Sequence, residues 1–206
     1  WYSDGCALFW KRGTFELISF ENIEYAVGNQ VMILAVLRHL DSGKAIVAAV
    51  THLKAQKSVS SEKIRCSQVE EFLSQVARAA EQAAKVDGVD EVPVLLIGDF
   101  NADPPQQVDG PISSIAQILK SGEDCSNLAY HSVYDVDPAP QGFYTTWKTR
   151  GKKTAKRVID YIFHSRKLHR DARLMVPSES EMEATKLPGL RYPSDHLAIG
   201  AKLRLV

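Results

Sequence analysis

The sequence predicts an α/β fold, more narrowly a layered α/β sandwich in which two β-sheets are flanked by helices. Several short apolar segments are separated by glycines, as strands and their turns are, and one long segment has apolar residues at helical spacing. The strands cluster around a few helices without a regular βαβ alternation. This arrangement favours stacked layers.

Four strands are predicted in the first quarter of the chain. The last two of them are apolar on both faces, which indicates a place inside a sheet that is covered on both sides. The four predicted strands cover residues 6–10, 15–20, 31–37 and 45–51.

A long amphipathic helix is predicted over residues 60–86, starting at Ser60 or Ser61. Phe72, Val76 and Ala80 lie on its apolar face, with charged residues between them. A strand at residues 93–100 and a shorter helix at residues 112–119 follow.

The last part of the chain alternates strands with polar connections. Residues 148–157 and 176–191 are predicted to be polar connecting segments. The predicted strands cover residues 143–147, 158–163 and 197–205.

Length and composition suggest one domain, residues 1–206, because a domain typically has about 150 residues. Lys plus Arg equals Asp plus Glu at 25 each, so no general positive field favours nucleic acid, and any phosphate recognition must be local. Three widely spaced cysteines, Cys6, Cys66 and Cys125, are typical of a reducing compartment. No stretch reaches the roughly 20 apolar residues of a membrane span. We therefore expect an intracellular, monomeric protein without a membrane partner, cytoplasmic or alternatively mitochondrial.

Polar groups recur where predicted strands end. The segments THLKA, IGDFNAD and YPSDH each follow or end an apolar run, and Asp160 lies inside another. Ligands of open sheets bind at strand ends, where side chains converge on a rigid backbone. Asp, Asn and His without Cys suggest hard-cation and phosphate chemistry. The residues that these segments contribute are His52, Lys54, Asp99, Asn101, Asp103, Asp195 and His196.

Structural readings of the same residues remain open. Asp99 and Asn101 could form an ordinary Asx turn stopped by Pro104, and His52 could be a hydrogen-bonded core histidine. Asp160 is harder to explain structurally, because an unpaired carboxylate in an apolar strand is costly to bury. The basic run at residues 148–157 is either a solvated loop or a phosphate-binding fork beside the site. Sequence signatures of dinucleotide-binding, P-loop, serine-hydrolase and zinc-protease sites are absent.

Six segments in order along the chain resemble the endonuclease/exonuclease/phosphatase superfamily, and within it the nocturnin-like branch, which is related to the carbon catabolite repressor deadenylases. GDFN and SDH alone indicate only the superfamily, whereas THLK together with TTWK narrows the resemblance to that branch. The segments are DGCALFW, VTHLKA, GDFNADP, YTTWKTR, IDYIF and YPSDHL.

The resemblance implies a phosphoesterase that uses Mg²⁺, with Mn²⁺ as a substitute. It implies that Asp99 activates the attacking water and that Asn101 donates to the phosphoryl oxygens. His196, oriented by Asp195, would hold the scissile phosphate, and Asp160 would position His52 at the same phosphate. The metal ligands that it implies in this chain are Asp99, Asn101 and Asp195.

The resemblance also implies a substrate. Proteins of the nocturnin-like branch are associated with removing the 2'-phosphate of NADP(H), and have also been described as poly(A) deadenylases. Lys54 and Arg150 match basic residues that grip the dinucleotide, and Trp147 and Lys148 lie in the same predicted site.

Two departures from the family pattern bear on function. Gln56 stands where the pattern has an arginine, and a neutral amide is a weaker partner for phosphate. The N-terminal third of the family domain, including the glutamate that is its main magnesium ligand, has no counterpart here, so residues 1–206 correspond to the C-terminal two thirds. We therefore predict a nucleotide phosphatase acting on NADP(H), with a poly(A) 3'-exoribonuclease and a catalytically impaired phospho-ligand binding module as alternatives.

Overall fold

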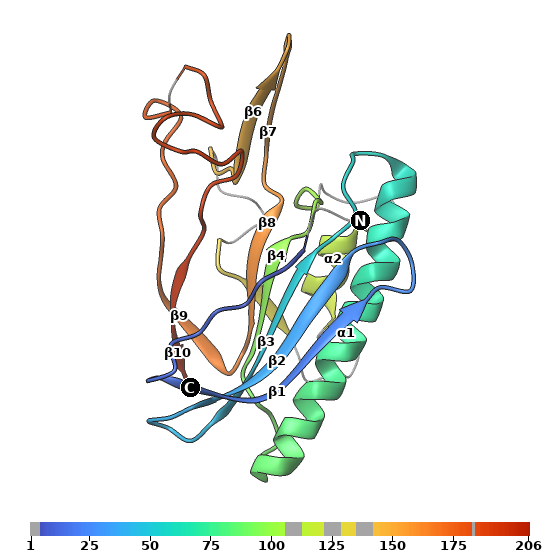
Figure 1. Ribbon diagram of the computed structural model, residues 1–206, viewed down its shortest axis with the longest axis vertical. Coiled ribbons are helices and arrows are strands. Elements are labelled where there is room, and N and C mark those ends of the chain that lie inside the picture. Colours follow the sequence, from blue (N-terminus) through green and yellow to red (C-terminus); the bar gives the residue numbers. More distant parts are fainter. Residues whose placement is uncertain (1–4, 106–112, 122–128, 135–141, 183) are drawn as a thin grey trace.

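The computed structural model describes residues 5–105, 113–121, 129–134, 142–182 and 184–206. A six-stranded mixed sheet forms its centre, with the strand order β1-β2-β3-β4-β8-β5 (Figure 1). Within it, β3 and β4 are parallel and the other neighbours are antiparallel. The bounds of these strands are β1 Phe15–Glu24, β2 Val31–His39, β3 Ala45–His52, β4 Val94–Asp99, β8 Asp160–Ser165 and β5 Tyr130–Ser132.

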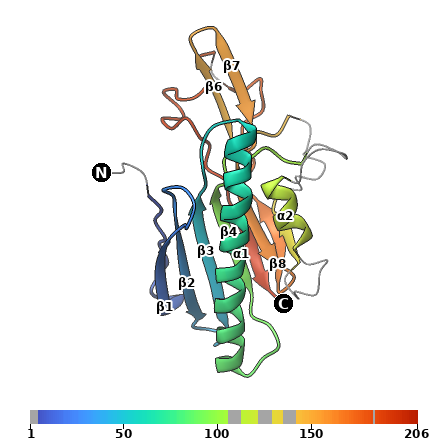
Figure 2. The ribbon, with the colours of Figure 1, turned by 90° about the vertical axis from the view of Figure 1, so that its right-hand side faces the viewer.

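Two helices cover one face of this sheet (Figure 2). Helix α1, Val59–Asp87, begins after Ser58, whose hydroxyl accepts a hydrogen bond from the amide of Ser61, and ends at Gly88 in the left-handed conformation. Helix α2, Ser114–Lys120, packs beside it. The predicted start at Ser60 or Ser61 is thus slightly late, because Ser58 has the extended backbone that a cap requires.

The core between the sheet and the helices is apolar and tightly filled. Phe72 of α1 lies against Phe100, which makes edge-on contacts with Tyr161 and Phe163 of β8. All four side chains are 1% exposed or less. Burying a large apolar side chain stabilises the fold by about 1.5–3 kcal/mol. The packing of these four side chains also fixes the end of β4 relative to β8.

Two two-stranded sheets accompany the central sheet. Strands β6, Thr146–Arg150, and β7, Lys153–Arg157, form an arm that projects beyond one end of the sheet (Figures 1 and 2). Strands β9, Leu168–Arg173, and β10, Ala201–Leu205, form the other pair. Mixed sheets flanked by helices confirm the predicted α/β class.

Several predicted elements are wrong in type or extent. Residues 148–157 form most of the β6–β7 hairpin instead of a loop, because Arg150 and Lys153 pair across a turn in which Gly151 has φ 60°. Residues 6–10 are not a strand; Leu8 and Trp10 pack against apolar residues of β2 and β3 without pairing. Asp160 begins β8 and does not lie in the middle of a strand. The last predicted strand is shorter, since pairing begins only at Ala201.

The sequence analysis missed two of the strands. β5 and β9 are mostly polar, and each begins with a single buried residue, Tyr130 and Leu168, so their composition gives little strand signal. The shorter predicted helix is confirmed as α2, although its predicted first residue lies outside the described residues. Among the described residues, no helix is both long enough and apolar enough to cross a bilayer.

Gly98 is required where β4 passes β3. Its φ is 153°, and a Cβ at this position would lie 1.9 Å from the carbonyl oxygen of Thr51. Gly98→Ala is therefore expected to lower the free energy of unfolding by about 3 kcal/mol or more, since backbone strain and a backbone clash both act. Urea unfolding followed by circular dichroism measures this loss. Gly43→Ala also has a positive φ but no neighbouring atom within 4 Å, so it serves as the control for strain alone.

Candidate functional site

Three polar side chains lie in one row across the end of the central sheet. His52 ends β3 and pairs in register with Asp99, which ends β4, and Asp99 pairs in register with Asp160, which begins β8. Residues directly opposite one another on neighbouring strands point to the same face of a sheet. The strand register therefore gathers an imidazole and two carboxylates at one edge.

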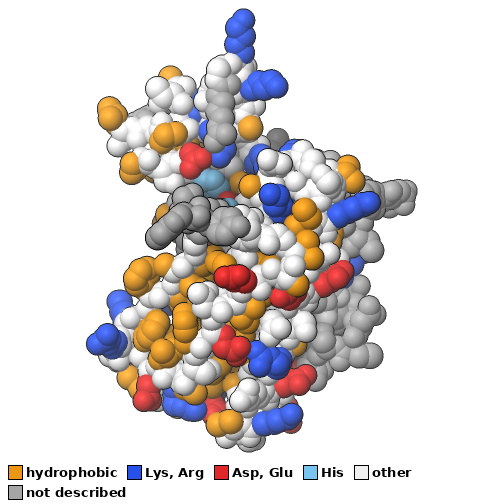
Figure 3. Space-filling view, turned by 45° about the vertical axis from the view of Figure 1, so that its right-hand side comes forward, with side chains coloured by type: hydrophobic (Ala, Val, Ile, Leu, Met, Phe, Trp, Pro, Cys, Tyr) orange, Lys and Arg blue, Asp and Glu red, His pale blue; other side chains and the backbone are white. Residues whose placement is uncertain are grey.

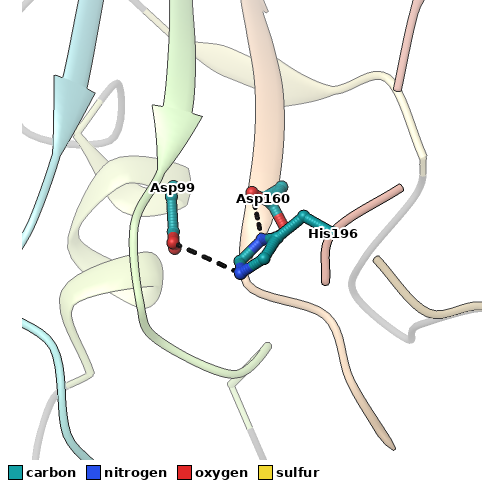
Figure 4. A group of neighbouring side chains, drawn as sticks. All are labelled: Asp99, Asp160 and His196. Carbon is teal, nitrogen blue, oxygen red and sulfur yellow. Dashed lines mark hydrogen bonds and ion pairs between the residues drawn. The ribbon is translucent and has the colours of Figure 1, made fainter. Parts of the chain in front are cut away.

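His196 joins this row from the C-terminal segment that precedes β10 (Figure 4). Its Nδ1 lies 2.9 Å from Oδ2 of Asp160 and 3.1 Å from Oδ1. Its Nε2 lies 4.0 Å from Oδ2 of Asp99, and Nε2 of His52 lies 3.7 Å from the same oxygen. Asp99 is thus placed between two imidazoles, and Asp160 orients one of them.

The site is partly buried, and this changes its acid–base properties. Burial of Asp99, together with the neighbouring Asp160 carboxylate, raises the pKa of Asp99. The hydrogen bond with Asp160 raises the pKa of His196, and this effect exceeds the lowering caused by burial. Asp99 is therefore a stronger base than a surface aspartate, and His196 is more readily protonated than an ordinary histidine.

Asn101 follows Asp99 in a tight turn. Its backbone N–H donates to Oδ1 of Asp99 at 2.8 Å, its φ is 52°, and its side-chain Nδ2 donates to the carbonyl of Leu53 at 3.0 Å. The Asx turn that was left open as a structural reading is therefore present. Phe100, between the two polar residues, is fully buried in the core and anchors the turn.

The pairing of acids with histidines differs from the one that the resemblance implied. Asp160, not Asp195, contacts His196; Asp195 forms an ion pair with Lys148 of β6 at 2.7 Å, which lowers the pKa of Asp195. His52 lies beside Asp99 and not beside Asp160. The reason is the strand order: β4 separates β3 from β8, so His52 and Asp160 are two strand spacings apart, about 9–10 Å.

The four predicted substrate-binding residues lie on two segments. Lys54 follows β3, half-buried, and its side chain forms no hydrogen bond or ion pair with the residues that the structure describes. Trp147 and Lys148 lie on β6; the Trp147 ring faces the ammonium groups of Lys156 at 5.1 Å and Lys186 at 4.0 Å. Arg150 ends β6, but its side chain lies outside the described residues.

Sequence reasoning missed the residues that hold the segment after His52. Arg65 of α1, only 3% exposed, donates to the carbonyls of Lys54 at 2.7 Å and Gln56 at 2.9 Å. Gln68 accepts from the backbone N–H of Lys54 at 3.0 Å. A signal existed: Arg65 and Gln68 are polar residues on the helix face that buries Phe72.

Glu62 completes this support. It forms an ion pair with Arg65 at 2.6 Å and accepts hydrogen bonds from the backbone N–H and the hydroxyl of Ser114, both at 2.8 Å. The Glu62–Arg65 pair therefore joins α1, α2 and the segment that carries Lys54.

The backbone of Asp160 is also supported by a residue that the sequence analysis did not single out. The hydroxyl of buried Thr145 accepts hydrogen bonds from the amides of Ile159 at 3.0 Å and Asp160 at 3.2 Å. Nothing in the sequence distinguished Thr145 from Thr146 beside it.

A divalent cation fits the cluster. Asp99, Asp160 and His196 offer ligand atoms that all lie within 4.8 Å of one another. Since both oxygens of Asp160 face Nδ1 of His196, Asp99 is the carboxylate best placed to bind an ion. The geometry groups Asp99 with Asp160 and His196, whereas the implied ligand Asp195 lies against Lys148.

Comparisons with known proteins find relatives over most of the chain. The model of the endonuclease/exonuclease/phosphatase family matches residues 2–196. Nocturnin of Xenopus laevis is 32% identical over 201 residues, which cover 95% of this chain and 47% of that protein. The chain therefore spans about half the length of this curated relative.

Solved structures show the same fold. The human nocturnin catalytic domain with a bound sulfate matches with a TM-score of 0.66 and 27% identity, over 95% of this chain and 61% of that one. ANGEL2, a 2',3'-cyclic phosphatase, matches with a TM-score of 0.67 and 21% identity, over 95% of this chain and 69% of that one. The family model matches nearly the whole length of the chain, and polar residues lie in a row at the ends of its strands; this chain therefore belongs to the endonuclease/exonuclease/phosphatase family.

Proposed function

We propose that this chain carries the phosphate-binding part of a magnesium-dependent phosphoesterase that acts on nucleotides, with the 2'-phosphate of NADP(H) as its preferred target. The observation that supports it most is the row of His52, Asp99 and Asp160 at one sheet edge, with His196 held against it.

The row divides acid and base work between two groups. Asp99 takes the proton of the attacking water. When no ion is bound, burial and the neighbouring Asp160 raise its pKa. His196, whose pKa is raised by its hydrogen bond with Asp160, donates through Nε2 to a phosphoryl oxygen and stabilises the charge that develops there. Environments that keep one group basic and the other protonated are typical of catalytic sites.

Other residues of the site bind and orient the phosphate. His52 lies on the far side of Asp99 from Asp160, so phosphoryl oxygens at this edge meet imidazoles from two sides. Asn101 is fixed by its bond to Leu53 beside them. A bound Mg²⁺, or Mn²⁺ in its place, would neutralise phosphoryl charge, and Asp99 is the residue of the cluster best placed to hold it.

Preference for a dinucleotide rests on the flanking segments and on the nocturnin relatives. Lys54 follows His52 at the end of β3, and Lys148 on β6 is paired with Asp195 beside His196. The Trp147 ring adds an aromatic group that carries the ammonium groups of Lys156 and Lys186. Gln56 is exposed and has a left-handed backbone with φ 82°, and its neutral amide leaves charge-based phosphate recognition to these neighbours.

One observation favours a second candidate, a 3'-exonuclease acting on poly(A). The β6–β7 arm projects beside the site, and the run at residues 148–157 contains Lys and Arg but no acid. Such an arm could contact the phosphates of a strand whose end lies at Asp99.

The test offers both substrates to the full-length protein with Mg²⁺. We expect orthophosphate from NADPH, measured with a phosphate sensor, and no AMP from oligo(A), measured by chromatography. Asp99→Asn serves as the inactive variant. Asp41→Asn makes the same chemical change at an exposed site and should leave both readouts unchanged.

Each contrary outcome selects an alternative. AMP from oligo(A) that disappears in Asp99→Asn would replace the phosphatase by the exonuclease. If neither product formed, but isothermal titration showed NADPH binding that Mg²⁺ does not strengthen, a binding module would replace both.

A further inference from the structure

Asp103 is the acid of the GDFNAD segment to which the chemistry above gives no role. We propose that Asp103 is a positioning residue: held by Arg157 of β7, its carboxylate fixes the turn that carries Asn101 and ties it to the substrate-binding segments. This inference rests on the proposed function, because the turn that it fixes is part of that site.

The central contact is a two-pronged ion pair. Nε of Arg157 donates to Oδ1 of Asp103 at 2.9 Å, and Nη2 donates to Oδ2 at 3.2 Å. The side chains are 19% and 26% exposed, so water screens the pair only in part. A bidentate pair of this kind fixes direction as well as distance.

The same guanidinium reaches the catalytic turn directly. Nη2 of Arg157 also lies 3.3 Å from the backbone carbonyl oxygen of Asn101. Arg157 therefore bonds the turn at two points, the backbone of Asn101 and the side chain of Asp103. These contacts stabilise an unfavourable backbone conformation, because Asn101 is left-handed with φ 52° and this conformation costs free energy.

The inner side of the turn has its own supports. The Tyr161 hydroxyl donates to the carbonyl of Ala102 at 2.7 Å, and the amide of Asn101 bonds Asp99. These contacts hold the turn against the core but leave its outer end, Asp103, to Arg157 and Lys57. The Asp103–Arg157 pair is thus a separate constraint.

Asp103 also connects the two segments that carry predicted substrate contacts. Arg157 pairs with Thr146 in β6, next to Trp147, so it lies at the base of the β6–β7 arm. Lys57, in the segment after His52 and Lys54, places Nζ 3.1 Å from Oδ2 of Asp103. Its side chain is 75% exposed, so this second ion pair contributes less than the first.

The test compares two carboxylates of similar setting. Asp103→Asn in the full-length protein keeps the shape and removes the charge. Asp171→Asn does the same at a bidentate arginine pair between β9 and β10, where Asp171 is 29% exposed and bonds Arg204 at 3.2 and 3.4 Å. With NADPH as substrate, kcat is expected to fall about tenfold to a hundredfold in Asp103→Asn and to stay unchanged in Asp171→Asn.

A merely structural role predicts a different pattern. If Asp103 only stabilised the fold, both variants would lower Tm alike and neither would change kcat at a temperature where the protein is folded. Asp103→Glu keeps the carboxylate, so its kcat is expected to lie close to that of the wild type. Arg157→Lys keeps the charge but loses the two-pronged contact, so its kcat is expected to lie between those of the wild type and Asp103→Asn. Equal kcat in Asp103→Asn and Asp171→Asn would overturn the proposal.

Hydrogen–deuterium exchange separates this inference from the proposed function. We expect faster amide exchange in residues 99–103 and 53–57 of Asp103→Asn, and no change there in Asp171→Asn. If the wild-type protein released no phosphate, the proposed function would fail and exchange alone would decide the role of Asp103. Unchanged exchange in both segments would overturn the positioning role even in an active enzyme.

Discussion

Replacing Asp99 by asparagine is expected to lower kcat for phosphate release from NADPH by about 10²- to 10⁴-fold, the usual contribution of a general base. Asparagine keeps the size of the side chain and can keep the hydrogen bond from the amide of Asn101, but it cannot accept a proton from water. The measurement is steady-state kinetics of the full-length protein at saturating Mg²⁺.

The same variant should not lose stability. Asp99 faces Asp160 across β4 and β8, and the pKa of Asp99 is raised first by burial and then by repulsion from the Asp160 carboxylate. Removing one of two like charges relieves that repulsion, so Tm without metal is expected to stay equal or rise. A loss of kcat accompanied by a large fall in Tm would show that Asp99 is structural, and an unchanged kcat would place the base elsewhere.

Glu62→Ala is expected to lower the free energy of unfolding by about 3 kcal/mol, the lower end of the cost of removing one partner of a buried ion pair, because Arg65 is buried but Glu62 is 25% exposed. Arg65 is 3% exposed and would keep its charge without its carboxylate. Ser114 would lose both hydrogen bonds that its backbone and hydroxyl donate to Glu62. Urea denaturation at pH 7 measures the loss, with Glu81→Ala, exposed on the same helix, as the control for helix propensity.

This contribution should depend on pH in one direction. Burial raises the pKa of Glu62, but the hydrogen bonds from Ser114 and Arg65 outweigh it, so the net pKa is lowered from its ordinary value of 4.5. A carboxylate with a lowered folded pKa stabilises the protein above its unfolded pKa and loses that effect as pH falls through the folded value. The stability gap between wild type and Glu62→Gln should therefore be widest near neutral pH and should narrow as pH falls below the ordinary value of 4.5. A gap that is constant with pH would contradict this role for the charge.

Much of the fold followed from local pattern. The apolar runs of β2 and β3, the periodicity of α1 and the PVLLIGDF segment that became β4 are strong signals, because each element buries a face that its own residues define. The β6–β7 arm was misread as a loop because half of its strand residues are charged and its two strands pair mainly with each other, with one further bridge from Lys148 to Leu187. β5 and β9 were missed for a similar reason, since pairing with neighbours and not composition makes them strands.

The arrangement of the site depends on contacts between distant residues, which local sequence patterns do not predict. The sequence by itself determined that His52 and Asp99 stand at strand ends, because strand termini and polar residues are both read locally. It placed Asp160 inside a strand, whereas Asp160 begins β8. Only the tertiary structure decided their partners. The strand order inserts β4 between β3 and β8, and a distant segment brings His196 to Asp160 and Asp195 to Lys148. Hydrogen-bond partners depend on distances of a few ångströms between residues far apart in the chain, and those distances are fixed by register and packing, which no single segment encodes.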